Sequence, residues 1–321
     1  MKTYFQEISK QIYKEDILNV MEKKYSTVGP MWVSNQMEWN NGIYASFKDH
    51  DKFMILIFLI KKTLDFYSRN SIKLTYDEFY KKNTFEIERF NITEISTALN
   101  IPKESARRKI IELESQGVIR RINKKIIIDT SCFSYSKPIN TIKRISAFLA
   151  TLSTMCYDEK VSKKRITSEK LELVIKNNFT NIWNFYYEMQ IPMILNYKKF
   201  FKDYESFHIF GTCVVNQHFD ARKLSEAHTD RESFLKSFFV GEKLAGINAM
   251  SISEISGIPR ATVIRKLKKL VKGKNLTIDD KKHYRLRENS LDHLAKQQAN
   301  VIFSLANFSS KVYNLAALNE K

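Results

Sequence analysis

The sequence predicts a mainly α-helical protein made of two similar halves, each carrying a small β-hairpin. The chain of 321 residues contains 8 glycines and 5 prolines, which leaves few residues that favour turns. Apolar residues recur at helical spacing through most of the chain, and a hydrophobic content of 43% is enough for a packed core. One motif also occurs twice, at about residues 91–129 and about residues 249–287.

The two copies of this motif align without a gap at an offset of 157 residues. The aligned pairs include apolar, proline and basic positions: Ile95 with Ile252, Pro102 with Pro259, Arg108 with Arg265, and Leu113 with Leu270. A second similarity lies upstream, where residues 47–53 resemble residues 201–207 at an offset of 154. Small loop insertions would produce this change in offset. We therefore predict an internal duplication, with homologous halves at residues 1–160 and 161–321.

Each copy begins with a short helix that is followed by a longer one. In the first copy we expect Thr93 to cap a helix from Glu94 to Leu99, because its hydroxyl can accept a hydrogen bond from a free backbone N–H. Pro102 ends that helix, since proline has no N–H donor and restricts the residue before it. A second helix is predicted over residues 103–116.

This second helix is expected to bury one face and to expose the other. Apolar residues at i, i+4 and i+7 predict a buried stripe in both copies: Ala106, Ile110 and Leu113, and Val263, Leu267 and Leu270. Short β-branched runs follow the helix, at 118–122 and 126–128 in the first copy and at 276–278 and 283–286 in the second. Gly117 can end the first helix as a C-cap. Each pair of runs predicts a β-hairpin with lysines at its tip.

The order of helix, turn, helix and hairpin resembles the winged helix-turn-helix of DNA-binding proteins, most closely the MarR-like and Lrp-like transcription regulators. MarR-like regulators are homodimers that place two recognition helices in successive major grooves, about one helical turn apart. The resemblance therefore implies that one chain with two such halves imitates the dimer. Because residues 103–105 differ from residues 260–262, the two half-sites need not be identical.

The charge distribution independently indicates a polyanionic partner. The chain has 53 Lys and Arg residues against 35 Asp and Glu residues, a formal net charge of +18. Residues 103–125 hold eight basic and three acidic side chains, and residues 260–287 hold eleven basic and two acidic ones. Neutralised phosphates release condensed counterions, and this release drives the binding of basic proteins to nucleic acids. Double-stranded DNA is therefore the expected partner.

The candidate DNA-binding residues lie in the two recognition helices and at the tips of the two wings. The helix residues are expected to meet base edges or adjacent phosphates, while the wing lysines hold the DNA backbone. They are Lys103, Ser105, Arg107, Arg108, Lys124, Lys125, Arg260, Thr262, Arg265, Lys266, Lys281 and Lys282.

We predict a sequence-specific transcriptional regulator that binds double-stranded DNA as a single-chain pseudo-dimer. Two alternatives stay open. A plasmid-type replication initiator also pairs two winged-helix domains in one basic chain, and it would bind repeated sites at an origin. A tandem winged-helix scaffold would bind protein instead, although the recognition helices of such scaffolds are usually less basic.

No pattern in the sequence predicts an enzyme, a metal site or a cofactor. The six histidines are scattered, and the three cysteines show no CxxC spacing. The longest apolar run, residues 53–60, is too short to span a bilayer, so we expect a soluble cytoplasmic protein without membrane contact. The aromatic-rich helices are expected to form the core of the protein. A pocket for a small-molecule effector near Trp183 is the alternative interpretation. The chain is expected to act as a monomeric pseudo-dimer or as a homodimer.

Overall fold

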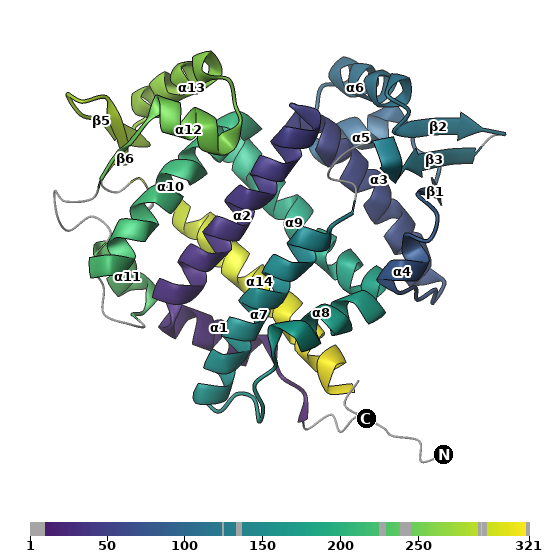
Figure 1. Ribbon diagram of the computed structural model, residues 1–321, viewed down its shortest axis with the longest axis horizontal. Coiled ribbons are helices and arrows are strands. Elements are labelled where there is room, and N and C mark those ends of the chain that lie inside the picture. Colours follow the sequence, from purple (N-terminus) through teal and green to yellow (C-terminus); the bar gives the residue numbers. More distant parts are fainter. Residues whose placement is uncertain are drawn as a thin grey trace.

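Long helices form the centre of the molecule, and two small sheets lie at its upper edges (Figure 1). The computed structural model describes residues 10–123, 125–132, 137–224, 229–237, 245–287, 290 and 294–318. Each sheet has three antiparallel strands. The prediction of a mainly helical fold with small β elements is confirmed.

The elements up to residue 158 form a first series. In chain order they are α1 (Lys14–Lys23), α2 (Tyr25–Phe47), α3 (His50–Arg69), α4 (Tyr76–Phe79), β1 (Thr84–Ile87), α5 (Ile92–Leu99), α6 (Lys103–Ser115), β2 (Ile119–Ile122), β3 (Lys125–Asp129) and α7 (Ile139–Asp158). A single 3-10 turn, Thr130–Cys132, follows β3.

A second series has the same element order. It comprises α8 (Ser168–Asn177), α9 (Phe179–Phe201), α10 (Tyr204–Leu224), α11 (Arg231–Ser237), β4 (Ile247–Asn248), α12 (Ala249–Ser256), α13 (Arg260–Lys272), β5 (Leu276–Ile278), β6 (His283–Leu286) and α14 (Ala295–Leu318). α1 and α8 each have 10 residues, α2 and α9 each have 23, and α6 and α13 each have 13. The strand orders β1-β3-β2 and β4-β6-β5 also correspond. The two series are arranged with approximate two-fold symmetry about a midline (Figure 1).

The junction of α2 with α3 has the same design as the junction of α9 with α10. Lys48 and Lys202 adopt left-handed backbone conformations, with φ of 51° and 70°, and end the first helix of each pair. The next residue is an aspartate that caps the following helix. Its Oδ1 accepts a backbone hydrogen bond at 2.9 Å for Asp49 and at 2.7 Å for Asp203. The upstream similarity in the sequence therefore corresponds to one repeated helix junction.

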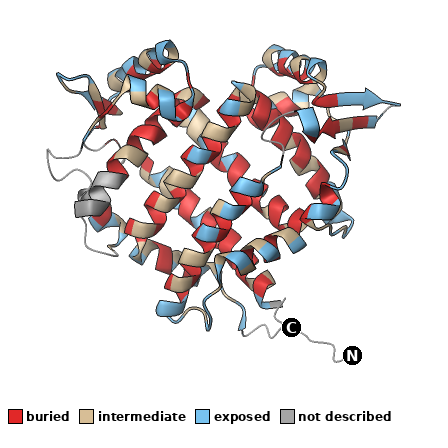
Figure 2. Ribbon diagram, in the orientation of Figure 1, coloured by how far each residue is buried: buried red, intermediate tan, exposed pale blue. Residues whose placement is uncertain are grey.

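Helices of the two series pack against each other across the midline. α1 lies against α14 and α8 against α7, while α3 lies against α9 and α2 against α10. The buried hydrophobic side chains form one cluster that draws on both series, and the central helices are buried along much of their length (Figure 2). The predicted boundary between residues 160 and 161 falls between α7 and α8, but the core is shared across it.

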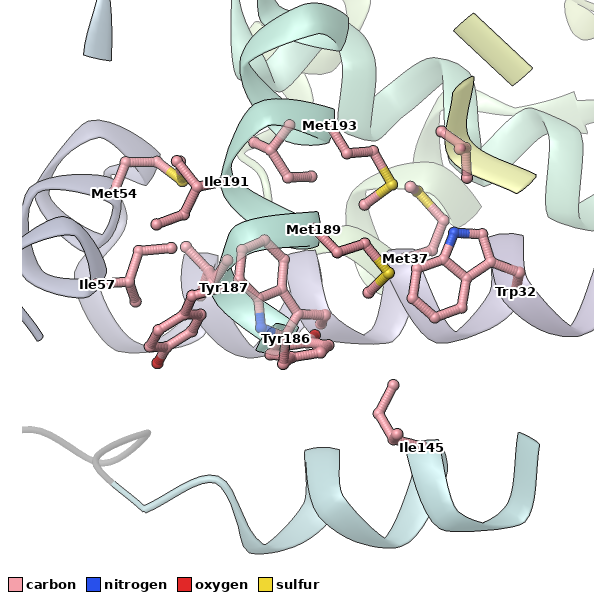
Figure 3. Close-up of a cluster of buried hydrophobic side chains, with 14 of the residues drawn as sticks. Trp32, Met37, Met54, Ile57, Ile145, Tyr186, Tyr187, Met189, Ile191 and Met193 are labelled. Carbon is pink, nitrogen blue, oxygen red and sulfur yellow. The ribbon is translucent and has the colours of Figure 1, made fainter. Parts of the chain in front are cut away.

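The aromatic residues expected to form core are buried. Trp183 is 2% exposed and Tyr186 is 1% exposed. The ring of Tyr186 lies 6.0 Å from Phe308, and on the other side of the midline Trp32 lies 5.5 Å from Phe148. Figure 3 shows Trp32 and Tyr186 packed among methionine and isoleucine side chains. These edge-on and tilted ring pairs add specific packing to the burial of apolar area.

Two glutamines meet at the midline, where α2 lies near α9. Gln36 Nε2 donates to Gln190 Oε1 at 3.2 Å, and Gln190 Nε2 donates to Gln36 Oε1 at 2.7 Å. Gln36 is 5% exposed and Gln190 is 0% exposed. Because the two amides form hydrogen bonds with each other, the pair can lie in an apolar core at little cost in folding free energy.

Removing one of these amides is expected to cost more than removing both. Gln36→Leu leaves the amide of Gln190 unpaired, which should lower the free energy of unfolding by about 1 to 3 kcal/mol. The double variant Gln36→Leu, Gln190→Leu removes both polar groups and should recover most of this loss. Urea unfolding measures the difference, and a double variant less stable than either single variant would contradict the expectation.

His50 lies at the same midline, at the start of α3. Its ring stacks on Tyr204 at a centroid distance of 5.7 Å and meets His208 edge-on at 5.5 Å. Burial lowers the pKa of His50 from 6.5 to about 4. Neither of its ring nitrogens has a hydrogen-bond partner in the part of the chain that the structure describes. The fold therefore accommodates the neutral ring.

The protein is accordingly expected to lose stability in mild acid. The unfolded state binds a proton near pH 6.5, whereas His50 in the folded state resists protonation down to about pH 4. The free energy of unfolding is therefore highest above pH 6.5 and decreases as the pH drops toward 4. Protonation of His50 accounts for roughly 3 kcal/mol of this decrease. His50→Phe should flatten this part of the profile of unfolding free energy against pH. A variant profile with the wild-type slope would show that the residue is not responsible.

Candidate nucleic-acid interface

Two matching helix pairs, α5 with α6 and α12 with α13, lie at the positions of the repeated motif. An asparagine caps the first helix of each pair, and its Oδ1 accepts a backbone hydrogen bond at 2.7 Å for Asn91 and at 2.9 Å for Asn248. The expectation that Thr93 is the N-cap is wrong, because α5 begins at Ile92 and includes Thr93 in its first turn. The two caps are 157 residues apart, which is the offset of the motif.

The turn between the paired helices is built in the same way twice. Asn100 and Gly257 adopt left-handed conformations, with φ of 49° and 70°. A serine hydroxyl then donates to the backbone oxygen five residues later, at 2.7 Å for Ser96 and at 2.6 Å for Ser253. A proline follows each turn and precedes the next helix, where a missing N–H donor costs little.

α6 and α13 lie at two corners of the same side of the molecule (Figure 1). The predicted apolar stripes are buried in both helices: Ala106, Ile110 and Leu113, and Val263, Leu267 and Leu270. The outer faces of both helices include exposed residues (Figure 2). One shared core therefore presents two helices of equal length on one side.

The outer face of α6 carries the predicted basic residues, and acidic neighbours partner two of them. Lys103, Arg107 and Arg108 are exposed, while Ser105 is half-buried. The Nε atoms of Arg107 and Arg108 lie 3.7 Å and 3.8 Å from glutamate oxygens of the same helix. α6 contains four basic and three acidic residues, so much of its positive charge is compensated locally.

α13 presents a stronger positive surface. Arg260 and Arg265 are exposed and Thr262 is half-buried. The exposed face continues through three lysines that were absent from the predicted set: Lys268, Lys269 and Lys272. Their spacing from Arg265 places them on or beside its face of the helix, and this spacing is visible in the sequence. α13 contains six basic and no acidic residues, and no described carboxylate pairs with these five exposed cations.

Lys266 does not belong to this exposed face, which corrects its place among the candidate DNA-binding residues. Its side chain is 7% exposed, and its Nζ lies 2.7 Å from Asp203 and 3.4 Å from Glu205, at the start of α10. Lys109 has the corresponding position in α6, where it pairs with Asp49 at the start of α3. These two lysines anchor α6 and α13 to the helical core.

The hairpin beside α6 matches its prediction, and its basic residues have acidic partners. Gly117 follows the end of α6 with φ of 74°, and β2 then pairs antiparallel with β3. The ion pairs are Lys125 with Glu86 at 3.1 Å, Arg121 with Glu114 at 2.7 Å, and Arg120 with Asp129. Lys124, predicted at the tip, lies outside the described residues.

The hairpin beside α13 carries exposed lysines at its turn. Asp279 shapes this turn, because its Oδ1 accepts a hydrogen bond from the backbone of His283 at 2.8 Å, which also lowers the pKa of Asp279. Lys281 and Lys282 are exposed, and no carboxylate in the described ranges forms an ion pair with them. The two sides of the interface therefore differ. Most basic residues on the α6 side have acidic partners, whereas the cations on the exposed face of α13 and at the turn of its hairpin have none among the described residues.

Comparisons with known proteins find no match to this chain among family models, curated proteins or solved structures. No helix in the described part of the chain is long and apolar enough to cross a membrane. The described residues also contain no group of three or more histidine, cysteine or acidic side chains that could hold a metal ion.

Proposed function

We propose that each series of elements contains a winged helix-turn-helix unit and that the two units arose by internal duplication. α5 and α6, or α12 and α13, would supply the helix pair, and the adjacent hairpin would supply the wing. The matching caps at Asn91 and Asn248 support this proposal, as do the two serine-closed turns. Further support comes from Gln36 and Gln190, which meet at the midline and are 154 residues apart.

We further propose that the protein is a transcriptional regulator that binds a specific double-stranded DNA sequence as a single-chain pseudo-dimer. The observation that carries this proposal is the placement of two exposed basic helices on one side of a shared core. In this proposal the two recognition helices of one chain would enter successive major grooves, about one helical turn apart. The exposed or half-buried residues that would read bases or contact phosphates include Lys103, Ser105, Arg107, Arg108, Lys125, Arg260, Thr262, Arg265, Lys281 and Lys282.

The surface of α13 favours DNA over a protein partner. Five exposed cations without described acidic partners repel one another on one short helix, and a row of phosphates relieves that repulsion. The α6 side is different, because its arginines must exchange glutamate partners for phosphate. We therefore propose unequal half-sites, in which the α13 side supplies more of the salt-dependent affinity.

Selection from a random double-stranded DNA library at two salt concentrations tests the proposed function. The expected result is enrichment of one bipartite, imperfectly symmetric motif. Tight binding without a motif, abolished by salt, would contradict sequence-specific regulation, because it would show phosphate contacts alone. Absence of binding at both salt concentrations would refute the DNA proposal and favour a protein-binding scaffold.

A further inference from the structure

A lysine follows the last residue of each long central helix, at the junctions of α2 with α3 and of α9 with α10. Lys48 and Lys202 are both exposed, and their left-handed backbones have φ values of 51° and 70°. Glycine is favoured at such helix ends, because a Cβ atom crowds the backbone in this conformation. The sequence Phe-Lys-Asp nevertheless occurs in both junctions, at 47–49 and 201–203. The backbone conformation therefore gives no reason for a lysine at either position.

The other two residues of each junction have structural roles, whereas the lysine is exposed. The phenylalanine packs against the core, and the aspartate caps the next helix. Lys48 Nζ lies 5.5 Å from the centre of the Tyr44 ring, but neither Lys48 nor Lys202 has an acidic partner among the described residues. Lys199, in the last turn of α9, is also exposed and has no such partner in the described chain. These three cations are available to an anionic partner.

The two junctions lie between α6 and α13, on the side of the molecule that carries both helices (Figure 1). Lys202 lines a cleft of about 410 Å³ together with Pro102, which immediately precedes α6. Lys48 lies near the turn before α13, because the ring of Tyr44 approaches Gly257 there, within 3.9 Å of the position that a Cβ atom would take. Each junction lysine is therefore close to the start of the recognition helix of the other series.

Acidic side chains also line this cleft, but lysines of the fold pair with them. The acidic residues of the cleft are Asp49, Asp51, Asp203 and Glu205. Each pairs with a buried or half-buried lysine of α6, α9 or α13. The lysines of the cleft that have no acidic partner among the described residues are Lys199 and Lys202. The midline surface therefore keeps its free positive charge at these lysines and at Lys48.

We propose that Lys48, Lys199 and Lys202 contact phosphates along the minor groove at the centre of the DNA site. This inference rests on the proposed function, because two recognition helices in successive major grooves leave the minor groove between them facing the midline. Lys48 lies near α13 and the other two lysines lie near α6, so the three cations are distributed across that midline. They supply the contact that the recognition helices leave out.

This contact gives the protein a sequence preference at base pairs that it does not touch. A·T-rich segments have a narrow minor groove with an enhanced negative potential, which attracts lysine and arginine side chains. The central base pairs, between the two half-sites, lie outside the reach of both recognition helices. We therefore expect an A·T-rich centre to be preferred over a G·C-rich one.

Replacing the three midline lysines together by glutamine tests the inference. The probe is the duplex enriched by selection from the random library, with its central base pairs made all A·T or all G·C. On the A·T duplex we expect affinity at physiological salt to fall at least about tenfold, and the magnitude of the salt slope to fall by about three. The preference for the A·T centre should largely disappear. Arginine at the same three positions should restore both properties, and fluorescence anisotropy measures them.

The matched control replaces Lys160, Lys163 and Lys164 by glutamine. These lysines join α7 to α8 at the opposite end of the molecule (Figure 1), and Lys160 also has a left-handed backbone, with φ of 62°. The control removes the same charge and should keep the A·T preference and nearly all of the affinity. Both variants change lysines outside the core and should keep a nearly unchanged melting temperature.

The outcomes separate this inference from the proposed function. If wild type binds the selected duplex and the midline variant keeps its affinity and its A·T preference, the inference is overturned and the proposed function stands. Equal losses in the midline variant and the control would also overturn the inference, because they would show an effect of net charge alone. Failure of the wild type to bind any duplex would refute the proposed function itself.

Discussion

Replacing Arg265, Lys268 and Lys269 together by alanine is expected to weaken binding to the preferred duplex by at least about 100-fold at physiological salt. These cations lie on the exposed face of α13, and no described carboxylate pairs with them. Each lost phosphate contact also reduces the number of counterions that are released on binding. The magnitude of the slope of log affinity against log salt concentration should therefore fall by about one per side chain. Fluorescence anisotropy at several salt concentrations measures both quantities.

The matched control replaces Lys103, Arg107 and Arg108 of α6 by alanine. Both arginines have glutamate partners in α6, which they must leave to bind DNA, so a smaller loss of about tenfold is expected. Both triple variants change exposed residues and should keep a nearly unchanged melting temperature. Equal losses from the two helices would contradict the proposed asymmetry. Wild-type affinity in both variants would contradict the proposed interface.

Asp203→Ala is expected to lower the free energy of unfolding by about 3 kcal/mol. Asp203 caps α10 by accepting from the backbone N–H of Ser206 at 2.7 Å, and it pairs with Lys266 at 2.7 Å. Lys266 is buried, and in the variant its remaining acidic partner among the described residues would be Glu205, at 3.4 Å. The variant therefore loses a helix cap and leaves a buried ammonium poorly compensated. Urea unfolding at neutral pH measures the loss.

Asp203→Asn separates the two roles, because asparagine can still cap the helix but carries no charge. Burial alone would raise the pKa of Asp203, but hydrogen bonds from Lys266 and Ser206 bring it below its ordinary value of 3.8. The charge therefore stabilises the fold above about pH 3.8, and this contribution is lost as the pH falls through the lower folded pKa. The stability difference between wild type and Asp203→Asn should shrink in this range. A difference independent of pH would show that the charge has no part in it.

Local features of the fold could be predicted from the sequence because short-range rules determine them. Proline marks the start of both α6 and α13, and the second hairpin has the predicted bounds, 276–278 and 283–286. The N-cap of α5 was mispredicted because Asn91 and Thr93 are both good caps and lie two residues apart. The strands β1 and β4 were not predicted, because they have only four and two residues. Runs this short show no clear alternation of apolar and polar side chains.

Features that depend on distant contacts could not be predicted in the same way. Lys266 belongs to a helix with basic residues around most of its surface, and its burial depends on Glu205, 61 residues earlier, and on Asp203. Ion pairs of the hairpin beside α6 likewise join separate elements, such as Lys125 of β3 with Glu86 of β1. The sharing of one core by both series depends on helix packing across the midline, which no local pattern encodes.

The most direct test of the pseudo-dimer is the binding of one chain to a bipartite duplex before and after insertion of five base pairs between its half-sites. Half a helical turn moves the second half-site to the opposite face of the DNA. The account predicts one chain per duplex, with binding to the altered duplex weakened at least about 100-fold, to the level of a single half-site. Two chains per duplex, or an affinity unchanged by the insertion, would contradict the claim that α6 and α13 of one chain read the two half-sites together.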